Sequence, residues 1–134
     1  MKIRGIIADT GPLYAAIDRE DQYHQRSQQE LNKINQEQLA ILLPHPIYLE
    51  THKLILQSLG ITAALKFTKD IEKQVNFLNP TPEDYQAATS IITKFPDQKI
   101  TLFDAVTVIL ANQINLPVWT YDYHFDVMQA QVWR

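Results

Sequence analysis

Short apolar runs alternate with helical segments along the chain, and this alternation limits the fold more than any other feature of the sequence. Four of the runs have the length and composition of buried strands, and they cover residues 3–9, 39–44, 75–80 and 117–121. A short fifth strand at a sheet edge is expected over residues 130–134. Strands that are separated by helices pair in parallel, and a parallel sheet is covered by helices on both faces. We therefore predict an α/β fold built on a mostly parallel sheet of four to five strands.

The segments between these runs carry the usual helix signals. Pro12 suits a first helical turn, Gly60 is a stop signal, and Thr81 followed by Pro82 is a start signal. The predicted helices cover residues 10–18, 21–35, 46–60, 61–75, 81–95 and 102–115.

Length and composition fit one globular domain that spans residues 1–134. The net charge of −3 gives no attraction of the whole surface for polyanions, so any contact with nucleic acid must be local. The absence of cysteine excludes disulfides and thiolate metal sites and fits a reducing cytoplasm. No apolar run approaches the roughly 18 residues that a membrane span needs. We expect a soluble, cytoplasmic protein without a membrane segment.

Four acidic residues lie where the chain reaches one edge of the predicted sheet. Asp9 ends the first strand, and Asp122 follows the fourth strand by one residue. Asp104 begins the helix that leads into the fourth strand, and Glu50 lies about one turn into the helix after the second strand. Ligands of open parallel sheets bind at the carboxyl ends of the strands. We therefore expect Asp9, Glu50, Asp104 and Asp122, here called the acidic quartet, to converge at this edge.

Helix capping is the alternative explanation for each of the three aspartates. Asp9 precedes a predicted helix and is suited to cap it. Thr101 and Asp104 have the Thr-x-x-Asp spacing of a capping box, and Asp122 could cap a short helix that follows it. Each aspartate taken alone therefore fits a structural role, and only their convergence favours a functional site.

Glu50 is harder to explain by structure alone. Ile47 and Leu54 lie three residues before it and four residues after it, so the three share one helical face. That face should pack against the sheet, where an ionised group is costly unless it is paired. Lys53 is the candidate partner, although it also suits an exposed position.

Four converging carboxylates would repel one another, and each would favour protonation over sharing the site. A divalent cation removes this conflict. Ligation by oxygen alone selects hard ions such as Mg²⁺ or Mn²⁺. Such a site suits phosphodiester chemistry, in which the metal activates water and stabilises the leaving oxygen.

Other catalytic patterns are absent from the sequence. No His-x-x-x-His pair, Gly-x-Ser-x-Gly elbow or glycine-rich phosphate loop is present. His124 follows the last acid by two positions and could touch a phosphate, with a surface role as the alternative.

The sequence resembles the PIN-domain ribonucleases, specifically the VapC-like toxins of bacterial toxin–antitoxin pairs. The resemblance covers essentially the whole chain and rests on five segments in the family's order and spacing, namely IIADTGPLYAAID, DQYHQRS, IYLETHKL, ITLFDAVTVILA and VWTYDYHFDV. It implies a three-layer α/β/α sandwich, and a Mg²⁺- or Mn²⁺-dependent site that cleaves RNA. The chain departs from the family at Gly11-Pro12, which stiffens the first motif, and at the prolines before Glu50, which bears on substrate fit.

Carried over position by position, the resemblance makes the acidic quartet both the metal ligands and the catalytic residues. Thr10 and Thr120 match small hydroxyl residues beside the first and last acids and are expected to support them. Asp126, four residues after Asp122, is expected to assist or replace it.

The resemblance further implies a homodimer and inhibition by a small antitoxin that covers a groove among the first helices. The exposed apolar candidates for that groove are Leu13, Ile17, Leu56 and Leu59. We therefore expect a metal-dependent endoribonuclease toxin. The alternatives are a catalytically silent binding module of the same fold and another metal-dependent phosphoesterase, such as a DNA nuclease.

Overall fold

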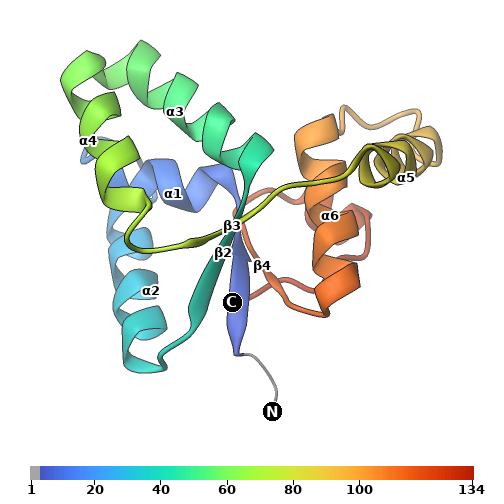
Figure 1. The fold of residues 1–134 in the computed structure, drawn as a ribbon, viewed down its shortest axis with the longest axis horizontal. Coiled ribbons are helices and arrows are strands. Elements are labelled where there is room, and N and C mark those ends of the chain that lie inside the picture. The colour runs from blue at the N-terminus through green and yellow to red at the C-terminus, as the bar shows by residue number, and fades with distance from the viewer. Residues whose placement is uncertain (1–3) are drawn as a thin grey trace.

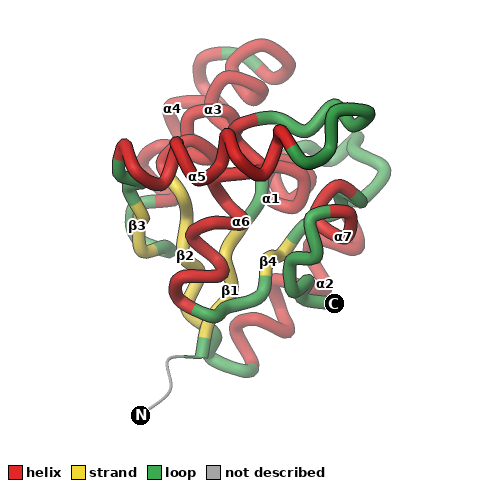
Figure 2. The backbone as a smooth tube through the Cα atoms, turned by 90° about the vertical axis from the view of Figure 1, so that its right-hand side faces the viewer, coloured by secondary structure: helices red, strands yellow, loops and turns green. Residues whose placement is uncertain are grey.

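A four-stranded parallel sheet forms the centre of the computed structural model, which describes residues 4–134. The strands are β1 (Gly5–Ala8), β2 (Ala40–Pro44), β3 (Asn76–Leu78) and β4 (Val118–Trp119). They lie in the order β3-β2-β1-β4, and all neighbours pair in parallel (Figure 2). The four predicted strands are therefore confirmed. The first strand and the last strand along the chain are neighbours in space.

The predicted fifth strand is reduced to a single bridge. Val132 pairs in parallel with Val118, beyond β4. The backbone N–H of Val118 donates to Gln131 at 2.8 Å, and that of Trp133 donates to Val118 at 2.9 Å. This end of the chain closes the edge of β4 without adding a full strand.

The helices cover both faces of the sheet, as predicted. They are α1 (Thr10–Ile17), α2 (His24–Gln36), α3 (His45–Leu59), α4 (Ile61–Ile71), α5 (Pro82–Thr93), α6 (Leu102–Ile114) and α7 (His124–Val127). Figure 1 shows α1 to α4 on one side of the strands, and α5 and α6 on the other. The fold is therefore a three-layer α/β/α sandwich. None of the helices within residues 4–134 is long and apolar enough to cross a membrane.

Each face of the sheet contributes to its own hydrophobic cluster. Ile6 and Ala8 belong to the cluster under α1 to α4, whereas Ile7 between them belongs to the cluster under α5 and α6. Consecutive side chains of a strand point to opposite faces, so a strand that is buried on both faces needs an uninterrupted apolar run. All three side chains are fully buried. This explains why β1 reads as a short apolar segment without alternation.

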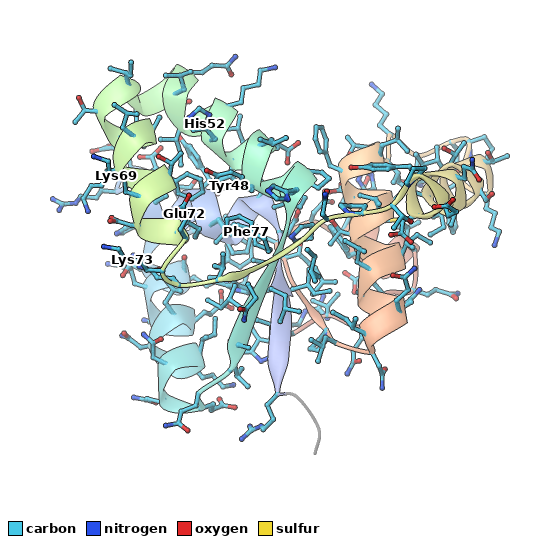
Figure 3. All side chains as sticks on the ribbon, viewed as in Figure 1. Tyr48, His52, Lys69, Glu72, Lys73 and Phe77 are labelled. Carbon is cyan, nitrogen blue, oxygen red and sulfur yellow. The ribbon has the colours of Figure 1, made fainter. Side chains whose placement is uncertain are left out.

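Two local contacts bring neighbouring elements close together. A Cβ atom on Gly5 would lie 2.9 Å from the carbonyl oxygen of Ala40, so the close pairing of β1 with β2 requires glycine at this position. On the outer edge of the sheet, the rings of Tyr48 in α3 and Phe77 in β3 meet edge to face with centroids 5.1 Å apart (Figure 3). The contact holds the first turns of α3 against β3.

The pairing of β1 with β4 determines where the acids lie. The register extends one residue past β1, because the backbone N–H of Asp9 donates to Trp119 at 3.0 Å. Both strands therefore end at the same edge. Asp9 follows one of them, and Thr120 and Asp122 follow the other.

Candidate functional site

The acidic quartet lines one cavity at the carboxyl edge of the sheet. The cavity has a volume of about 570 Å³ and is open to solvent. Its other lining residues include Thr10, Tyr14, Tyr23 and Thr101. The structure thus brings together four acids that are spread over more than a hundred positions of the chain.

Asp9 occupies the cap position of α1 but does not cap it. Among residues 4–134, no side-chain capping hydrogen bond links Asp9 to that helix. Its Oδ2 atom accepts a hydrogen bond of 2.7 Å from the hydroxyl of Thr120. Its Oδ1 atom is buried and has no hydrogen-bond partner within the described chain. A buried carboxylate oxygen without a partner is costly, and a bound cation would satisfy it.

Burial raises the pKa of Asp9 from 3.8 to about 6. The hydrogen bond from Thr120 and the nearby backbone N–H of Thr10 oppose this rise, and the negative charges of Glu50 and Asp122 add to it. The hydroxyl of Thr120 therefore helps to keep Asp9 ionised.

Asp104 and Asp84 occupy equivalent positions in two helices that begin with the same Thr-x-x-Asp motif. In α5, the backbone N–H of Thr81 donates to Asp84 at 2.9 Å, and that of Asp84 donates to Thr81 at 3.2 Å, which completes a capping box. In α6, only the bond from the backbone N–H of Asp104 to Thr101 forms, at 3.2 Å. The carboxylate of Asp104 is thereby left available to the cavity.

The two equivalent aspartates have opposite pKa shifts. Hydrogen bonds from the backbone of Thr81 and from Gln113 lower the pKa of Asp84. Burial, together with the negative charges of Asp9, Asp122 and Glu50, raises the pKa of Asp104 from 3.8 to about 8. Capping therefore explains Asp84 but not Asp104. The protein spends free energy to hold the Asp104 carboxyl group in this place.

Asp122 makes two hydrogen bonds in the turn that leads into α7. Its Oδ1 atom accepts a hydrogen bond of 2.9 Å from the backbone N–H of His124, the first residue of α7. Its own backbone N–H donates to the hydroxyl of Thr120 at 3.0 Å. Thr120 therefore connects Asp9 and Asp122. One potential ligand atom from each of Asp104, Asp122 and His124 lies within 4.8 Å of the other two.

Glu50 accepts a short hydrogen bond from the hydroxyl of Thr10. The alternative that Lys53 pairs with it is not supported, because no ion pair between them is found in residues 4–134 and Lys53 is exposed. Glu50 and Asp9 line the same cavity as the Asp104–Asp122–His124 group without belonging to that close group.

Asp126 is not brought to the site. It is exposed, and both of its carboxylate oxygens accept hydrogen bonds from Arg134, at 3.2 and 3.1 Å. It lies outside the set of described residues that line the cavity. Asp122 precedes α7 whereas Asp126 lies within it, and the carboxylate of Asp126 is bound to Arg134, which is why it does not replace Asp122.

Glu30 has a role that sequence reasoning missed. It accepts hydrogen bonds from Trp119 Nε1, at 3.0 Å, and from the hydroxyl of Tyr121. It also pairs with Arg26 at 3.4 Å, and the guanidinium of Arg26 lies 4.3 Å from the centre of the Tyr121 ring. These contacts tie α2 to the segment between β4 and Asp122. In the sequence Glu30 is one of several polar residues of an exposed helix, so nothing singles it out.

The charge and donor set of the cavity fit a divalent cation. The lining residues include five carboxylates and, within the described chain, neither lysine nor arginine. The buried, unpartnered oxygen of Asp9 and the raised pKa of Asp104 are costs that a cation would offset. Carboxylate donors without thiolate suit Mg²⁺ or Mn²⁺.

Comparison with known proteins places this geometry in a family. The family model of the PIN domain matches residues 6–130. None of the curated proteins matches the chain significantly in sequence.

Solved structures share the fold over nearly their whole length. VapC20 of Mycobacterium tuberculosis, described as a toxin that cleaves the sarcin–ricin loop, superposes with a TM-score of 0.81 at 14% identity, covering 94% of this chain and 96% of its own. VapBC2 of Rickettsia felis, bound to a promoter DNA fragment, gives 0.73 at 11% identity, with 95% of each chain covered. FitAcB of Neisseria gonorrhoeae gives 0.68 at 17% identity, with 96% of each covered. With an α/β/α sandwich, converging acids and a family match over residues 6–130, the chain belongs to the PIN-domain family.

Proposed function

We propose that this protein is a Mg²⁺- or Mn²⁺-dependent endoribonuclease that acts in the cytoplasm as the toxin of a toxin–antitoxin pair, with residues 1–134 as a single nuclease domain. The observation that carries the proposal is the convergence of the acidic quartet in one open cavity on a PIN fold, with a buried Asp9 oxygen that lacks a partner within the described chain. The nearest functional support is the solved VapC20 toxin, whose fold this chain shares.

The residues of the cavity have different roles. Asp9, Asp104 and Asp122 would hold the metal, and Glu50 would complete the site or orient the attacking water. The hydroxyls of Thr120 and Thr10 hold the carboxylates of Asp9 and Glu50 in place.

A bound Mg²⁺ or Mn²⁺ supplies positive charge that offsets the charge developing on the phosphate oxygens and makes water a better nucleophile. The carboxylate of Glu50 accepts a hydrogen bond from the attacking water and so directs it toward phosphorus. The openness of the cavity leaves room for an RNA strand to enter. The net charge of −3 then causes no difficulty, because the positive charge is needed only at the cleaved phosphate.

Purified protein tests the catalytic claim. RNA cleavage should require Mg²⁺ or Mn²⁺, stop with a chelator, and fall at least about 100-fold in Asp104→Asn, since that residue holds the metal. Asp84→Asn is the matched control, because it changes the equivalent position of another helix outside the cavity. Its cleavage rate should stay within about twofold of the wild type.

Two outcomes would replace the proposal with its alternatives. Intact RNA at saturating metal, with the protein folded, would indicate a binding module that does not cleave. Cleavage of DNA in preference to RNA would indicate another metal-dependent phosphoesterase.

We propose an antitoxin and a second copy of the chain as its protein partners. Similar folds occur in VapBC2 and in a toxin–antitoxin complex from Klebsiella pneumoniae, which matches with a TM-score of 0.64 at 14% identity. A groove of about 810 Å³ lies between α1, α2 and α4, and its lining includes the expected Leu13, Ile17 and Leu59. Leu13 is only 6% exposed and belongs to the core, and Leu56, although 42% exposed, is outside the described lining.

Expression in cells tests the toxin role. Growth arrest that is relieved by co-expressing a short neighbouring reading frame would support it. Unimpaired growth with abundant folded protein would contradict it. Light scattering of the purified chain measures whether it forms a homodimer.

A further inference from the structure

His124 lies outside the described cavity lining but in a close group with two of the lining acids, Asp104 and Asp122, and the acidic quartet does not explain this position. Its side chain is only 14% exposed although it is in a short surface helix. The ring packs against Tyr123 with centroids 4.5 Å apart, and the next residue, Phe125, is fully buried and anchors α7. The backbone N–H of His124 donates to Asp122. The imidazole is therefore held in place by the protein and is not a freely moving surface group.

The distances around His124 are close to those of ligands that share one ion, so small side-chain movements would bring the three groups onto it. Its Nδ1 atom lies 3.4 Å from Oδ1 of Asp122, which is longer than an ordinary N–H···O hydrogen bond. Neighbouring ligands of an octahedral ion with bonds of about 2.1 Å are about 3 Å apart, and opposite ligands are about 4.2 Å apart. The potential ligand atoms of Asp104, Asp122 and His124 lie within 4.8 Å of one another, which is close to this range.

A second observation indicates that the cavity holds a ligand. Asp9 is 4% exposed and lines the same cavity, and its Oδ1 atom has no hydrogen-bond partner in residues 4–134. The close group and the unpartnered oxygen come from different strands and loops. Both are explained by a cation, whereas an ion pair between His124 and Asp122 explains only the first.

We propose that His124 is a nitrogen ligand of this metal site, together with Asp104 and Asp122, and that it makes the site selective for Mn²⁺ over Mg²⁺. Mn²⁺ also takes mainly oxygen ligands, but as a transition metal it accepts an imidazole nitrogen more readily than Mg²⁺, which prefers oxygen ligands and gives up its water reluctantly. The proposal rests on the metal site of the proposed function, and it specifies which ion that site prefers.

Pulsed EPR of the full-length protein with added Mn²⁺ tests the ligand directly. Protein carrying natural-abundance histidine should show ¹⁴N coupling of the bound Mn²⁺, and protein labelled with ¹⁵N-histidine should show ¹⁵N coupling in its place. His124→Gln should abolish the nitrogen coupling. His52→Gln is the matched control, because His52 lies on α3 (Figure 3) and outside the Asp104–Asp122–His124 group, and it should leave the spectrum unchanged.

Calorimetric titration tests the selectivity. His124→Gln should weaken Mn²⁺ binding at least about tenfold and Mg²⁺ binding less than about threefold. Equal losses for both ions would overturn the selectivity, and a wild-type spectrum without nitrogen coupling at saturating Mn²⁺ would overturn the ligand. The wild-type spectrum alone decides whether His124 is a ligand, even when His124→Gln does not fold.

RNA cleavage measured on the same samples separates this inference from the proposed function. Cleavage with only oxygen ligands around Mn²⁺ would contradict the role of His124 and leave the nuclease proposal standing. Nitrogen coordination in a protein that leaves RNA intact would support the role of His124 and contradict the nuclease proposal.

Discussion

Asp104→Asn should stabilise the metal-free protein at neutral pH, although it removes a negative charge from the first turn of α6. Asp104 has its pKa raised from 3.8 to about 8 by burial and by its acidic neighbours. The unfolded chain ionises this carboxyl group near pH 3.9, whereas the folded protein keeps it protonated up to about pH 8. Its contribution to the free energy of unfolding therefore becomes less favourable as the pH rises through this interval and is constant above it.

The size of the effect follows from the same interval. The loss is about 1.4 kcal/mol per pH unit, or about 4 kcal/mol at pH 7. An amide at this position adds N–H groups that need partners, which costs about 2 kcal/mol. The net gain of Asp104→Asn is therefore about 2 kcal/mol, which corresponds to about 7 °C in Tm for a chain of this length.

Thermal unfolding in EDTA between pH 5 and 9 measures this prediction. The wild type should lose stability from pH 5 to 8. In Asp104→Asn this slope should vanish above pH 6 and become shallower below pH 6, where Asp9, with a pKa of about 6, still contributes. Asp84→Asn, at the equivalent position of α5, should instead lower Tm, because it breaks a complete capping box. A rise in Tm for Asp104→Asn and a fall in Tm for Asp84→Asn, at equivalent positions of two helices, is the result that distinguishes this prediction.

Added Mn²⁺ should reverse the order of stability. Binding to the folded wild type alone raises its Tm by mass action, and Asp104→Asn binds the ion too weakly to gain. The reasoning is refuted if Asp104→Asn lowers Tm in EDTA as Asp84→Asn does, since its carboxylate would then be a cap and not a ligand held at a cost.

Three further substitutions test other parts of the structure. Thr120→Val should raise the pKa of Asp9 above about 6 and move the acidic limb of the pH–rate profile to higher pH, because it removes the 2.7 Å hydrogen bond; Thr120→Ser should leave the profile in place. Gly5→Ala should cost about 1–3 kcal/mol in urea unfolding, because its Cβ atom would lie 2.9 Å from the Ala40 oxygen. Gly11→Ala, whose Cβ atom would meet nothing closer than 3.7 Å, should cost nothing measurable or stabilise slightly, and an equal loss in both glycine variants would contradict the steric argument.

The sequence by itself determined the order of the elements and the edge to which the acids come. An uninterrupted apolar run such as residues 5–8 has to lie in a sheet that is covered on both faces, and parallel strands end at the same edge. Asp9 and Asp122 follow such strands, so their convergence was predictable without knowing a single contact. The resemblance then supplied the three-layer arrangement, which the structure confirms.

Tertiary structure alone decided what each side chain does at that edge. Thr81-x-x-Asp84 and Thr101-x-x-Asp104 are the same local pattern, yet one carboxylate closes a capping box and the other is left to the cavity. Local sequence cannot separate them, because the difference is the electrostatic environment created by distant residues.

The same reason applies to the contacts that sequence reasoning missed. Glu30 joins Trp119 and Tyr121 across about ninety positions, and Asp126 turns to Arg134 at the end of the chain. A hydrogen bond depends on distance and direction in space, and these are defined only after the layers have packed. The sequence could therefore place charges at an edge, whereas only the packed structure could assign each of them a partner or leave it free for a metal.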